Sequence, residues 1–551
     1  MLRAPRPPKF PIPGCRPGAG PSPARAPGYR ACWKGGSRCG IGRWWLGLTA
    51  PRSSASTASR WRSRRPARWA HRGRRSSARR NRRSGRPGIA CALALQSHGL
   101  WKGDGEQAVL INLAPARVRK TGTGLDLPIC LAVMALHAPP LREAVEGLLA
   151  YAEVGLDGSL RPAPGTLSAA LTARQHGFAR LLVAPAAARE AAQVDGLEVL
   201  AARTLGDAAG YLRGDGEALA PWPEPVRAST DAGLDLAEVR GQHAARRALE
   251  VAAAGGHNLL LIGPPGSGKT LLARRLATIL PPMTRGEALE VTRIHSAAGV
   301  IPAGGGLVEQ RPFRAPHHSV SPAGLIGGGS PPRPGEVSLA THGVLFLDEL
   351  PEFPRHVLEN LRQPLEDGEV TLVRVAGRAR FPARFILAAA MNPCPCGWYG
   401  CSLRECRCSS GAVGRYRGRI SGPLLDRIDM HVPVRAVSAA ELSRTRPGEP
   451  SEEVRRRVVA ARAVQVRRNG RWAVTSNAHL RPRDLPQACA LIPAARKALD
   501  SAMERLQLSA RAHDRLLKLA RTLADLAGRE AIAVADIAEA VSYRCLDRLD
   551  Y

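Results

Sequence analysis

Three segments in the middle of the chain are almost continuously apolar. They span residues 258–262, 344–347 and 385–390. Continuous apolar runs of this length are typical of strands buried on both faces of a parallel sheet. A helical spacing of apolar residues precedes the first run at 236–254 and follows it at 271–280. This alternation predicts an α/β unit with a parallel sheet over residues 234–434.

The C-terminal part of the chain follows a different pattern. Its apolar residues recur with a period of 3.6 residues, which predicts a mostly helical region over 435–551. The expected helices are 452–468, 494–506, 510–526 and 534–543.

A second, smaller α/β unit is expected before the central one, over residues 93–213. Residues 108–113 read as a strand, and residues 127–136 read as an apolar helix or a buried strand. The stretch 214–233 contains Pro221, Pro223 and Pro225, and we expect it to be a linker.

Residues 1–92 form an anomalous basic segment of low complexity with neither period. The chain of 551 residues carries a net charge of +34, but residues 1–103 hold 24 of its 80 Lys and Arg and no Asp or Glu. The body of the chain is therefore only about +10. A segment without apolar periodicity offers no face to bury, and we expect it to be disordered or mistranslated.

Three interpretations of this basic segment compete. It could be an arm that binds nucleic acid, or an organellar transit peptide rich in Arg and Ser. The interpretation that we favour is translation of a GC-rich gene in a wrong frame or from a wrong start, which would yield this mixture of Arg, Pro, Gly, Ala, Ser and Trp.

The body of the chain is expected to be cytoplasmic and to make no membrane contact. No apolar run reaches the ~18 residues that a membrane-spanning helix needs.

Five of the twelve cysteines lie within residues 394–408, which favours a metal site over a disulfide framework. Two CxC pairs could supply four thiolates to a tetrahedral Zn²⁺, with Cys401 as a fifth candidate and reduced thiols or a redox disulfide as alternatives. The pairs consist of Cys394, Cys396, Cys406 and Cys408.

A phosphate-binding motif follows the first apolar run and precedes a helical one, which is the context that a P-loop requires. Glycines let the backbone N–H groups surround phosphates, and the helix N-terminus adds positive potential. Lys269 is expected to reach the β- and γ-phosphates of ATP, and the Thr270 hydroxyl is expected to bind Mg²⁺. The motif consists of Gly263, Pro264, Pro265, Gly266, Ser267, Gly268, Lys269 and Thr270.

The other two apolar runs end in polar residues that suit ATP hydrolysis. Residues 344–347 lead into Asp348 and Glu349, which a parallel strand would deliver to the carboxyl edge of the sheet. Asp348 would complete the Mg²⁺ shell, and Glu349 would polarise the attacking water. Asn392 follows residues 385–390 and would orient that water, unless it only forms a turn before Pro393.

Together these motifs resemble the ComM/YifB family of magnesium-chelatase-like AAA+ proteins. The resemblance covers about residues 93–551 and implies an N-terminal Lon-protease-like domain, an AAA+ core and a C-terminal helical lid in a hexameric ring. Besides the P-loop, it rests on the sequences TRIHS (292–296), FRAPHHS (313–319), PEF (351–353), LRQPLEDG (361–368), MNPCPCG (391–397) and SGPLLDRID (421–429).

The resemblance implies ATP-driven helicase or branch-migration work on single-stranded or branched DNA during recombination of incoming strands. It implies that Arg427 is the arginine finger that reaches the γ-phosphate of a neighbouring subunit, and that Arg511 senses nucleotide in its own subunit. A surface salt bridge is the alternative for each. Gly124 stands where Lon carries its serine nucleophile, so no protease activity is expected.

Residues 370–381 read as a β-hairpin with Gly377 in its turn. In related ring helicases a hairpin at this place points into the pore. Arg374, Arg378 and Arg380 are therefore candidates for contacts with DNA phosphates, and a solvated charged hairpin is the alternative. His317 and His318 lie in a Pro/Gly-rich loop and are expected either to contact substrate or to have a structural role.

Two other functions stay open. The chain could be a chelatase subunit, whose ATP hydrolysis drives Mg²⁺ insertion into a porphyrin by a partner. It could also be a regulatory ATPase that remodels proteins, with the Lon-like part as an adaptor. The cysteine cluster and the additional N-terminal domain favour the DNA motor over a chelatase subunit.

Overall fold

The computed structural model of the chain describes residues 91, 93–96, 98–100, 112–113, 123–215, 233–301, 306–330, 332–374, 377–401, 404–436 and 447–548. It also describes the backbone of two short strands nearer the N-terminus. These are β1 (Trp45–Leu46) and β2 (Ser63–Arg64), which pair antiparallel with each other, and β2 pairs in the same way with β3 (Asn112–Leu113). The predictions for the basic segment and for the linker fall almost wholly outside the described residues, as do residues 108–111 of the expected first strand.

The described part of the N-terminal α/β unit is built on a parallel sheet in the order β4-β7-β8. Its strands are β4 (Leu148–Tyr151), β7 (Arg180–Val183) and β8 (Glu198–Ala201). Alternate strand residues enter two different apolar clusters, so both faces of the sheet are buried. The helices are α2 (Asp126–His137), α3 (Pro139–Ala144), α4 (Thr166–Gln175), α5 (Pro185–Ala191) and α6 (Leu205–Arg213). The apolar stretch 127–136 is therefore a helix.

The central unit contains a five-stranded sheet in the order β10-β13-β16-β9-β17, and all neighbouring strands are parallel. The three apolar runs are strands, as predicted, and β9 lies between β16 and β17. The strands are β9 (Leu259–Ile262), β10 (Phe313–Arg314), β13 (Val344–Leu347), β16 (Ile386–Met391) and β17 (Met430–Pro433).

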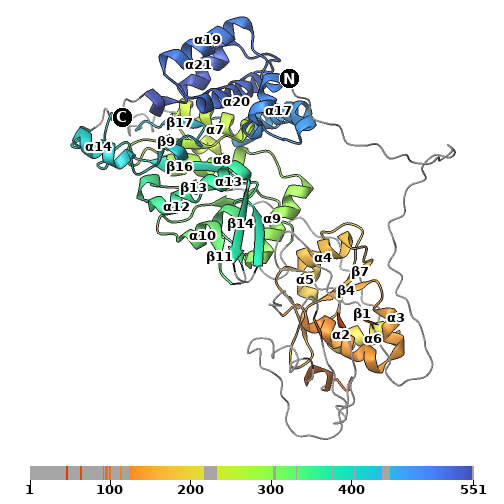
Figure 1. The fold of residues 1–551 in the computed structure, drawn as a ribbon. Helices are drawn as coiled ribbons and strands as arrows, with labels where there is room; N and C mark the ends of the chain where they lie inside the picture. Colours follow the sequence, from red (N-terminus) through yellow and green to blue (C-terminus); the bar gives the residue numbers. More distant parts are fainter. Residues whose placement is uncertain are drawn as a thin grey trace, which may run out of the picture. The chain divides into compact units, whose positions relative to one another are not determined.

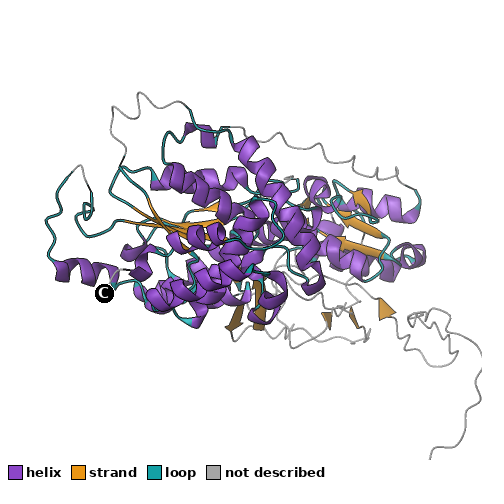
Figure 2. Cartoon of the chain, turned by 90° about the horizontal axis from the view of Figure 1, so that it is seen from above, coloured by secondary structure: helices purple, strands orange, loops and turns teal. Residues whose placement is uncertain are grey.

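Both faces of this sheet are covered, which explains why its strands are apolar at every position. On one face, Leu259, Leu261 and Phe346 pack with α7 (His243–Gly255), α8 (Lys269–Leu276) and C-terminal helices. On the other face, Leu260 and Leu345 pack with α12 (Arg355–Glu359) and with the hairpin of β14 (Glu369–Arg374) and β15 (Gly377–Pro382). Figures 1 and 2 show these strands between helices.

The C-terminal region is helical, as its periodicity predicted. It contains α17 (Ser451–Asn469), α18 (Leu485–Ala488), α19 (Pro493–Arg505), α20 (Ala510–Leu526) and α21 (Val534–Ser542). Helices α17 and α20 pack against α7 of the central unit (Figure 1). The remaining named elements are β5 (Glu153–Val154), β6 (Leu160–Arg161), α9 (Arg285–Ala298), α10 (Pro322–Ile326), β11 (Gly327–Gly328), β12 (Arg333–Pro334), α11 (Glu336–Leu339), α13 (Arg362–Asp367), α14 (Ser410–Arg417) and α15 (Gly422–Leu425), with short 3₁₀ turns between some of them.

The helix expected over 236–254 is interrupted. A short 3₁₀ turn at Leu236–Glu238 is followed by Gly241 and Gln242, which both have positive φ, and α7 begins only at His243. Two successive left-handed residues cannot continue a right-handed helix, so the apolar spacing spans two separate elements. The helix expected over 271–280 instead begins at Lys269 and changes to a 3₁₀ turn at Ala277–Ile279.

A buried polar network holds the C-terminal helices together, and removing its centre should destabilise them. The fully buried Asp525 carboxylate accepts hydrogen bonds from Arg468 at 2.6 Å, from Arg521 at 3.1 Å and from Asn477 at 2.8 Å. Asp525→Ala leaves two guanidinium groups without their carboxylate, so we expect the free energy of unfolding to fall by about 3–5 kcal/mol. The exposed control Arg456→Ala should change it by less than about 0.5 kcal/mol. Urea unfolding followed by helical circular dichroism measures both, and equal effects of the two substitutions would contradict the network's role.

Candidate active site

The P-loop joins β9 to α8 at the carboxyl edge of the central sheet. Gly266 and Gly268 have φ values of 75° and 86°, which glycine adopts without strain. A Cβ atom on Gly263 would lie 2.2 Å from the carbonyl oxygen of Val434, so no side chain fits there. These three glycines let the backbone turn tightly and approach β17, which exposes the loop N–H groups at the start of α8.

Lys269 lies between the loop and the neighbouring strand. Its Nζ donates to the carbonyl oxygens of Gly263 at 2.8 Å and Pro264 at 2.9 Å, and to Oδ1 of Asn392 at 3.1 Å. Burial lowers the pKa of Lys269, while Asp348 and Glu349 act in the opposite direction. The side chain of Asn392, at the end of β16, thus lies beside the group expected to contact the γ-phosphate. It is not confined to a local turn.

Thr270 and Asp348 form the pair of groups expected to hold Mg²⁺. The Thr270 hydroxyl donates to Oδ2 of Asp348 at 2.7 Å, although the two residues are 78 positions apart. A hydroxyl and a carboxylate oxygen are ligands that suit Mg²⁺, which retains several waters and also binds the phosphates of its nucleotide. The residues present therefore fit the cation.

Glu349 has an unusual backbone conformation. Its φ is 53°, in the left-handed region, and its N–H donates to Oδ1 of Asp348 at 3.0 Å. Non-glycine residues in this region cluster at functional sites. His318 Nδ1 lies 3.9 Å from Oε2 of Glu349, and the His318 ring packs edge-on against Phe353. His318 of the Pro/Gly-rich loop is thus beside the carboxylate expected to polarise water.

Gln242 is a candidate site residue that the sequence analysis missed. Its Nε2 donates to the carbonyl oxygens of Ser267 at 3.3 Å and Arg435 at 2.6 Å, so it joins the P-loop to the segment after β17. The signal that could have found it is a glycine followed by a polar residue inside an otherwise apolar helical spacing.

The two arginines inferred from the resemblance lie apart from this set of contacts. The side chain of Arg427 is 9% exposed, pairs with Glu366 and donates to the Pro423 carbonyl oxygen at 2.5 Å. Arg511 is 69% exposed and lies 3.9 Å from Asp426, at the start of α20.

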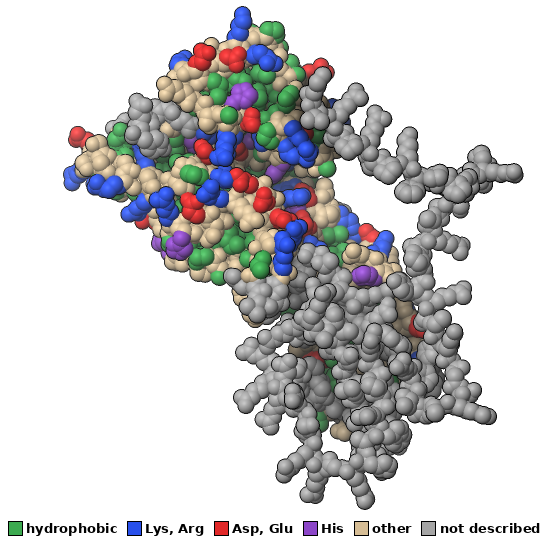
Figure 3. Space-filling model, viewed as in Figure 1, with side chains coloured by type: hydrophobic (Ala, Val, Ile, Leu, Met, Phe, Trp, Pro, Cys, Tyr) green, Lys and Arg blue, Asp and Glu red, His purple; other side chains and the backbone are tan. Residues whose placement is uncertain are grey.

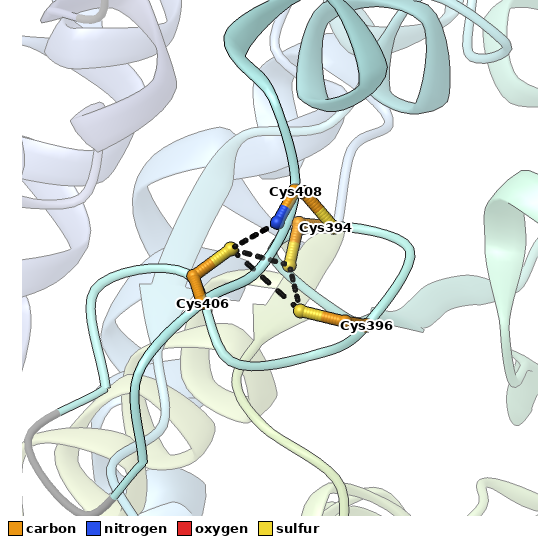
Figure 4. Close-up of side chains that lie close together, drawn as sticks. All are labelled: Cys394, Cys396, Cys406 and Cys408. Atoms are coloured by element: carbon orange, nitrogen blue, oxygen red, sulfur yellow. Dashed lines mark hydrogen bonds between the residues drawn. The ribbon is translucent and has the colours of Figure 1, made fainter.

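The four cysteines of the CxC pairs converge (Figure 4). The Sγ atoms of Cys394 and Cys396 are 3.4 Å apart, and that of Cys406 lies 3.7 and 3.6 Å from them. The four Sγ atoms, including that of Cys408, all lie within 4.8 Å of one another. Four sulfurs that are each about 2.3 Å from Zn²⁺ define a tetrahedron with edges of about 3.8 Å. The donor set therefore fits Zn²⁺, and Cys401 is not part of it.

Backbone N–H groups donate hydrogen bonds to sulfur atoms of this cluster. Tyr399 N–H donates to Sγ of Cys394 and Cys408 N–H donates to Sγ of Cys406, both at 3.4 Å. Hydrogen bonds from the backbone N–H groups of Trp398 and Arg407 lower the pKa of Cys396 to about 6. Although backbone hydrogen bonds act to lower them, desolvation and the neighbouring cysteines raise the pKa of Cys406 to about 12 and also raise the pKa of Cys408. A metal ion binds the thiolate form, so it must displace the protons of these two thiols.

The hairpin has one buried and one exposed face. Val370, Leu372, Ala379 and Phe381 are buried in the cluster beneath the sheet, while the opposite face exposes Val373, Arg378 and Arg380. Arg380 also lies 3.7 Å from Glu369. Gly377 pairs with Arg374 and begins β15, so it closes the turn that was predicted to contain it. The side chain of Arg374 lies outside the described residues.

A second basic surface surrounds the cysteine cluster. On the face drawn in Figure 3, blue side chains gather near α14. Tyr399 is 47% exposed, and the Arg417 guanidinium lies 5.1 Å from the centre of its ring. The exposed basic residues here are Arg404, Arg407, Arg415 and Arg419.

The fold and the site define an ATPase of the AAA+ type, and comparisons with known proteins agree. Residues 235–442 match the family model of magnesium chelatase subunit ChlI, residues 448–544 match the model of its C-terminal part, and residues 102–187 match a further model of subunit ChlI of Mg-chelatase.

Several curated proteins are similar over most of their length. Competence protein ComM of Haemophilus influenzae is 42% identical over 456 residues, which cover 80% of this chain and 86% of that protein. YifB of Escherichia coli is 42% identical over 443 residues, with the same coverage. An uncharacterized protein of Mycobacterium tuberculosis is 43% identical over 438 residues, or 78% of this chain and 85% of that protein.

This chain belongs to the magnesium-chelatase ChlI-like family, as a relative of ComM and YifB. The resemblance drawn from its motifs is confirmed. Membership implies ATP and Mg²⁺ as cofactors, and the four-cysteine cluster could hold Zn²⁺. In the described part of the chain, every helix is too short or too polar to cross a bilayer.

Two substitutions should separate ATP binding from ATP hydrolysis. Lys269→Ala removes the cation that would contact the phosphates and should weaken ATP binding. Glu349→Gln retains those contacts but cannot polarise water, so ATP should stay bound while kcat falls by about 10²–10⁴-fold. Equilibrium nucleotide binding and phosphate release measure the two effects. Parental hydrolysis by Glu349→Gln would contradict the role given to this carboxylate.

Proposed function

We propose that this chain is an ATP-driven DNA motor that acts as a ring of six subunits in the recombination of incoming DNA. The observation that carries the proposal is the position of the basic hairpin in the chain. It lies between β13, which leads into Asp348, and β16, which leads into Asn392. Only residues 383–385 separate β15 from β16. The hairpin is therefore joined directly to the strand that leads into Asn392.

The chemistry of the hairpin suits a nucleic-acid backbone. Arg378 and Arg380 project from the exposed face of the hairpin. Val373, which pairs with Arg378 across the two strands, adds an exposed apolar side chain to this basic face. Guanidinium groups bind phosphates without regard to sequence. The basic surface beside the cysteine cluster offers a second contact, because aromatic rings next to arginines stack on unpaired bases.

The names of two relatives support a DNA role. The Haemophilus influenzae relative is a competence protein, and a 104-residue match at 35% identity links 19% of this chain to DNA repair protein RadA of Escherichia coli. The match to ChlI models favours the alternative of a chelatase subunit. Stimulation of ATP hydrolysis by DNA distinguishes the two functions, because a chelatase subunit has no reason to respond to DNA.

The location of Arg427 supports the proposed ring. This guanidinium is held by Glu366 and the Pro423 carbonyl, away from Lys269, so we infer that it serves the nucleotide of an adjacent subunit. Arg511, which is exposed at the start of α20, is assigned to sensing nucleotide within its own subunit as α20 moves.

We assign residues 93–213 to a partial Lon-protease-like domain that guides substrate and has no protease activity. A Cβ atom on Gly124 would lie 2.2 Å from the ring of the buried Tyr151, so the position has no room for a serine. Residues 214–233 then link this domain to the AAA+ core at 234–434, and residues 435–551 form the lid.

Removing the hairpin charges should weaken DNA binding equally for all sequences. Replacing Arg374, Arg378 and Arg380 with alanine should reduce the salt slope of log affinity by about 0.7–0.9 for each arginine that binds a phosphate. Fluorescence anisotropy with unrelated oligonucleotides at several salt concentrations measures the slope.

The matched control replaces two arginines of α17, the half-buried Arg455 and the exposed Arg456. It retains the basic N-terminal segment, as the hairpin variant does, so that segment cancels in the comparison. The hairpin variant should keep its basal ATPase activity but lose stimulation by DNA. Equal slopes and equal stimulation in both variants would rule out the hairpin as the DNA contact.

A shared active site predicts complementation between subunits. Arg427→Ala and Lys269→Ala chains should each be inactive, whereas their mixture should regain part of the activity, because some interfaces pair an intact P-loop with an intact arginine. A mixture of Lys269→Ala and Glu349→Gln chains is the control and should stay inactive, since both lesions affect the same side of the interface. ATPase assays of the two mixtures test this expectation. Two equally inactive mixtures would contradict a role of Arg427 at the nucleotide of a neighbouring subunit.

A further inference from the structure

The turn that follows Cys396 packs directly against the P-loop. A Cβ atom on Gly397 would lie 2.5 Å from Cδ and 2.8 Å from Cγ of Pro265, and 3.9 Å from Cγ of Asn392. Gly397 follows the cluster residue Cys396, is buried and has a φ of 84°. Its N–H donates to the Cys394 carbonyl at 3.0 Å, which closes a tight turn. Only glycine combines this conformation with this contact.

The same turn is also connected, through the chain, to Asn392, which contacts Lys269. Asn392 precedes Cys394 by two residues and accepts a hydrogen bond from Lys269 Nζ at 3.1 Å. On the P-loop side, Lys269 also donates to Pro264, the neighbour of Pro265. The backbone around the cluster is therefore attached to both groups that hold the ammonium, by a covalent link to Asn392 and by packing against Pro265.

Packing alone holds this segment weakly. Among the described residues of 394–408, Cys394 is the one with a buried side chain. The other restraints include a hydrogen bond at 3.2 Å from Arg417 Nε to the Pro393 carbonyl. A loop with so small an apolar core gains its rigidity from a metal ion.

We propose that a thiophilic divalent cation such as Zn²⁺, bound by the four cysteines, positions the P-loop and Asn392 for ATP through Gly397. Cys394, Cys396, Cys406 and Cys408 are then ligands, and Gly397 is a positioning residue that touches neither nucleotide nor metal. The inference rests on ATP binding at the P-loop, and it makes that binding depend on the metal.

The test compares zinc content with nucleotide affinity in the full chain. Metal analysis should find about one Zn²⁺ per parental chain. Cys406→Ser should lose the zinc and bind ATP about 10–100-fold more weakly, because a displacement near 1 Å misplaces the contacts. Cys401→Ser, outside the cluster, should keep both properties. Treating the parent with a chelator should weaken ATP binding to the same extent, and adding Zn²⁺ should restore it.

Substitution of Gly397 separates positioning from metal binding. Gly397→Ala should retain zinc and the parental unfolding temperature of the C-terminal helices but bind ATP about 10–100-fold more weakly. Gly400→Ala is the matched control, because Gly400 also has a positive φ, of 72°, but no atom within 4 Å of its would-be Cβ. Calorimetric titration with ATP gives the affinities.

Three results would overturn the inference. They are a parent that holds no zinc, a Cys406→Ser chain that loses zinc but binds ATP as the parent does, and equal ATP affinities for Gly397→Ala and Gly400→Ala. If Cys406→Ser does not fold, the glycine pair and the chelated parent still decide. A parent that binds zinc but no ATP would instead contradict the proposed function.

Discussion

The register of three parallel strands is the constraint on which the candidate site depends. Ile262 of β9 pairs with Met391 of β16 on one side and with Pro433 of β17 on the other. The three strands therefore end in register, and the residues that follow them, Gly263, Asn392 and Val434, lie side by side. The Gly263 N–H donates a hydrogen bond to the Met391 carbonyl oxygen at 3.2 Å, which extends the pairing of β9 and β16 by one residue. Lys269 can contact the carbonyl oxygens of the P-loop and the Asn392 side chain at once because β9 and β16 end in register.

The opposite edge of the sheet is held by polar groups that also bind the C-terminal helices. Asn258, just before β9, accepts a hydrogen bond from Leu387 N–H at 2.8 Å and donates to the Arg427 carbonyl at 3.1 Å. Its neighbour His257 contacts Thr522 of α20 at 2.8 Å. Burial opposes ionisation of Asp429, yet His257 and Arg515 hold the pKa of Asp429 well below its usual range. Because unsatisfied buried polar groups are costly, these contacts hold α20 against the segment that carries Arg427.

Much of the fold and part of the site could be predicted from residues that are close in the sequence. The P-loop is contiguous, and its glycines and its lysine carry their conformational and chemical meaning locally. The three buried strands were predicted because a strand covered on both faces is apolar at every position. The C-terminal helices α17, α19, α20 and α21 were predicted to within a residue or two, because each buries residues at helical spacing. Gly241 and Gln242 were missed, since apolar spacing does not report a backbone reversal.

By itself, then, the sequence determined the class of fold, the phosphate-binding loop and the residue types available for catalysis and metal binding. Tertiary structure alone decided which of them meet. Lys269 and Asn392 are 123 positions apart, and Thr270 and Asp348 are 78 apart. The sequence singled out the two CxC pairs and left Cys401 as a fifth candidate, and the chain path then brought four sulfurs together without Cys401. The physical reason is that strand register and the packing of loops on the sheet edge set distances between remote side chains, and no local pattern encodes those distances.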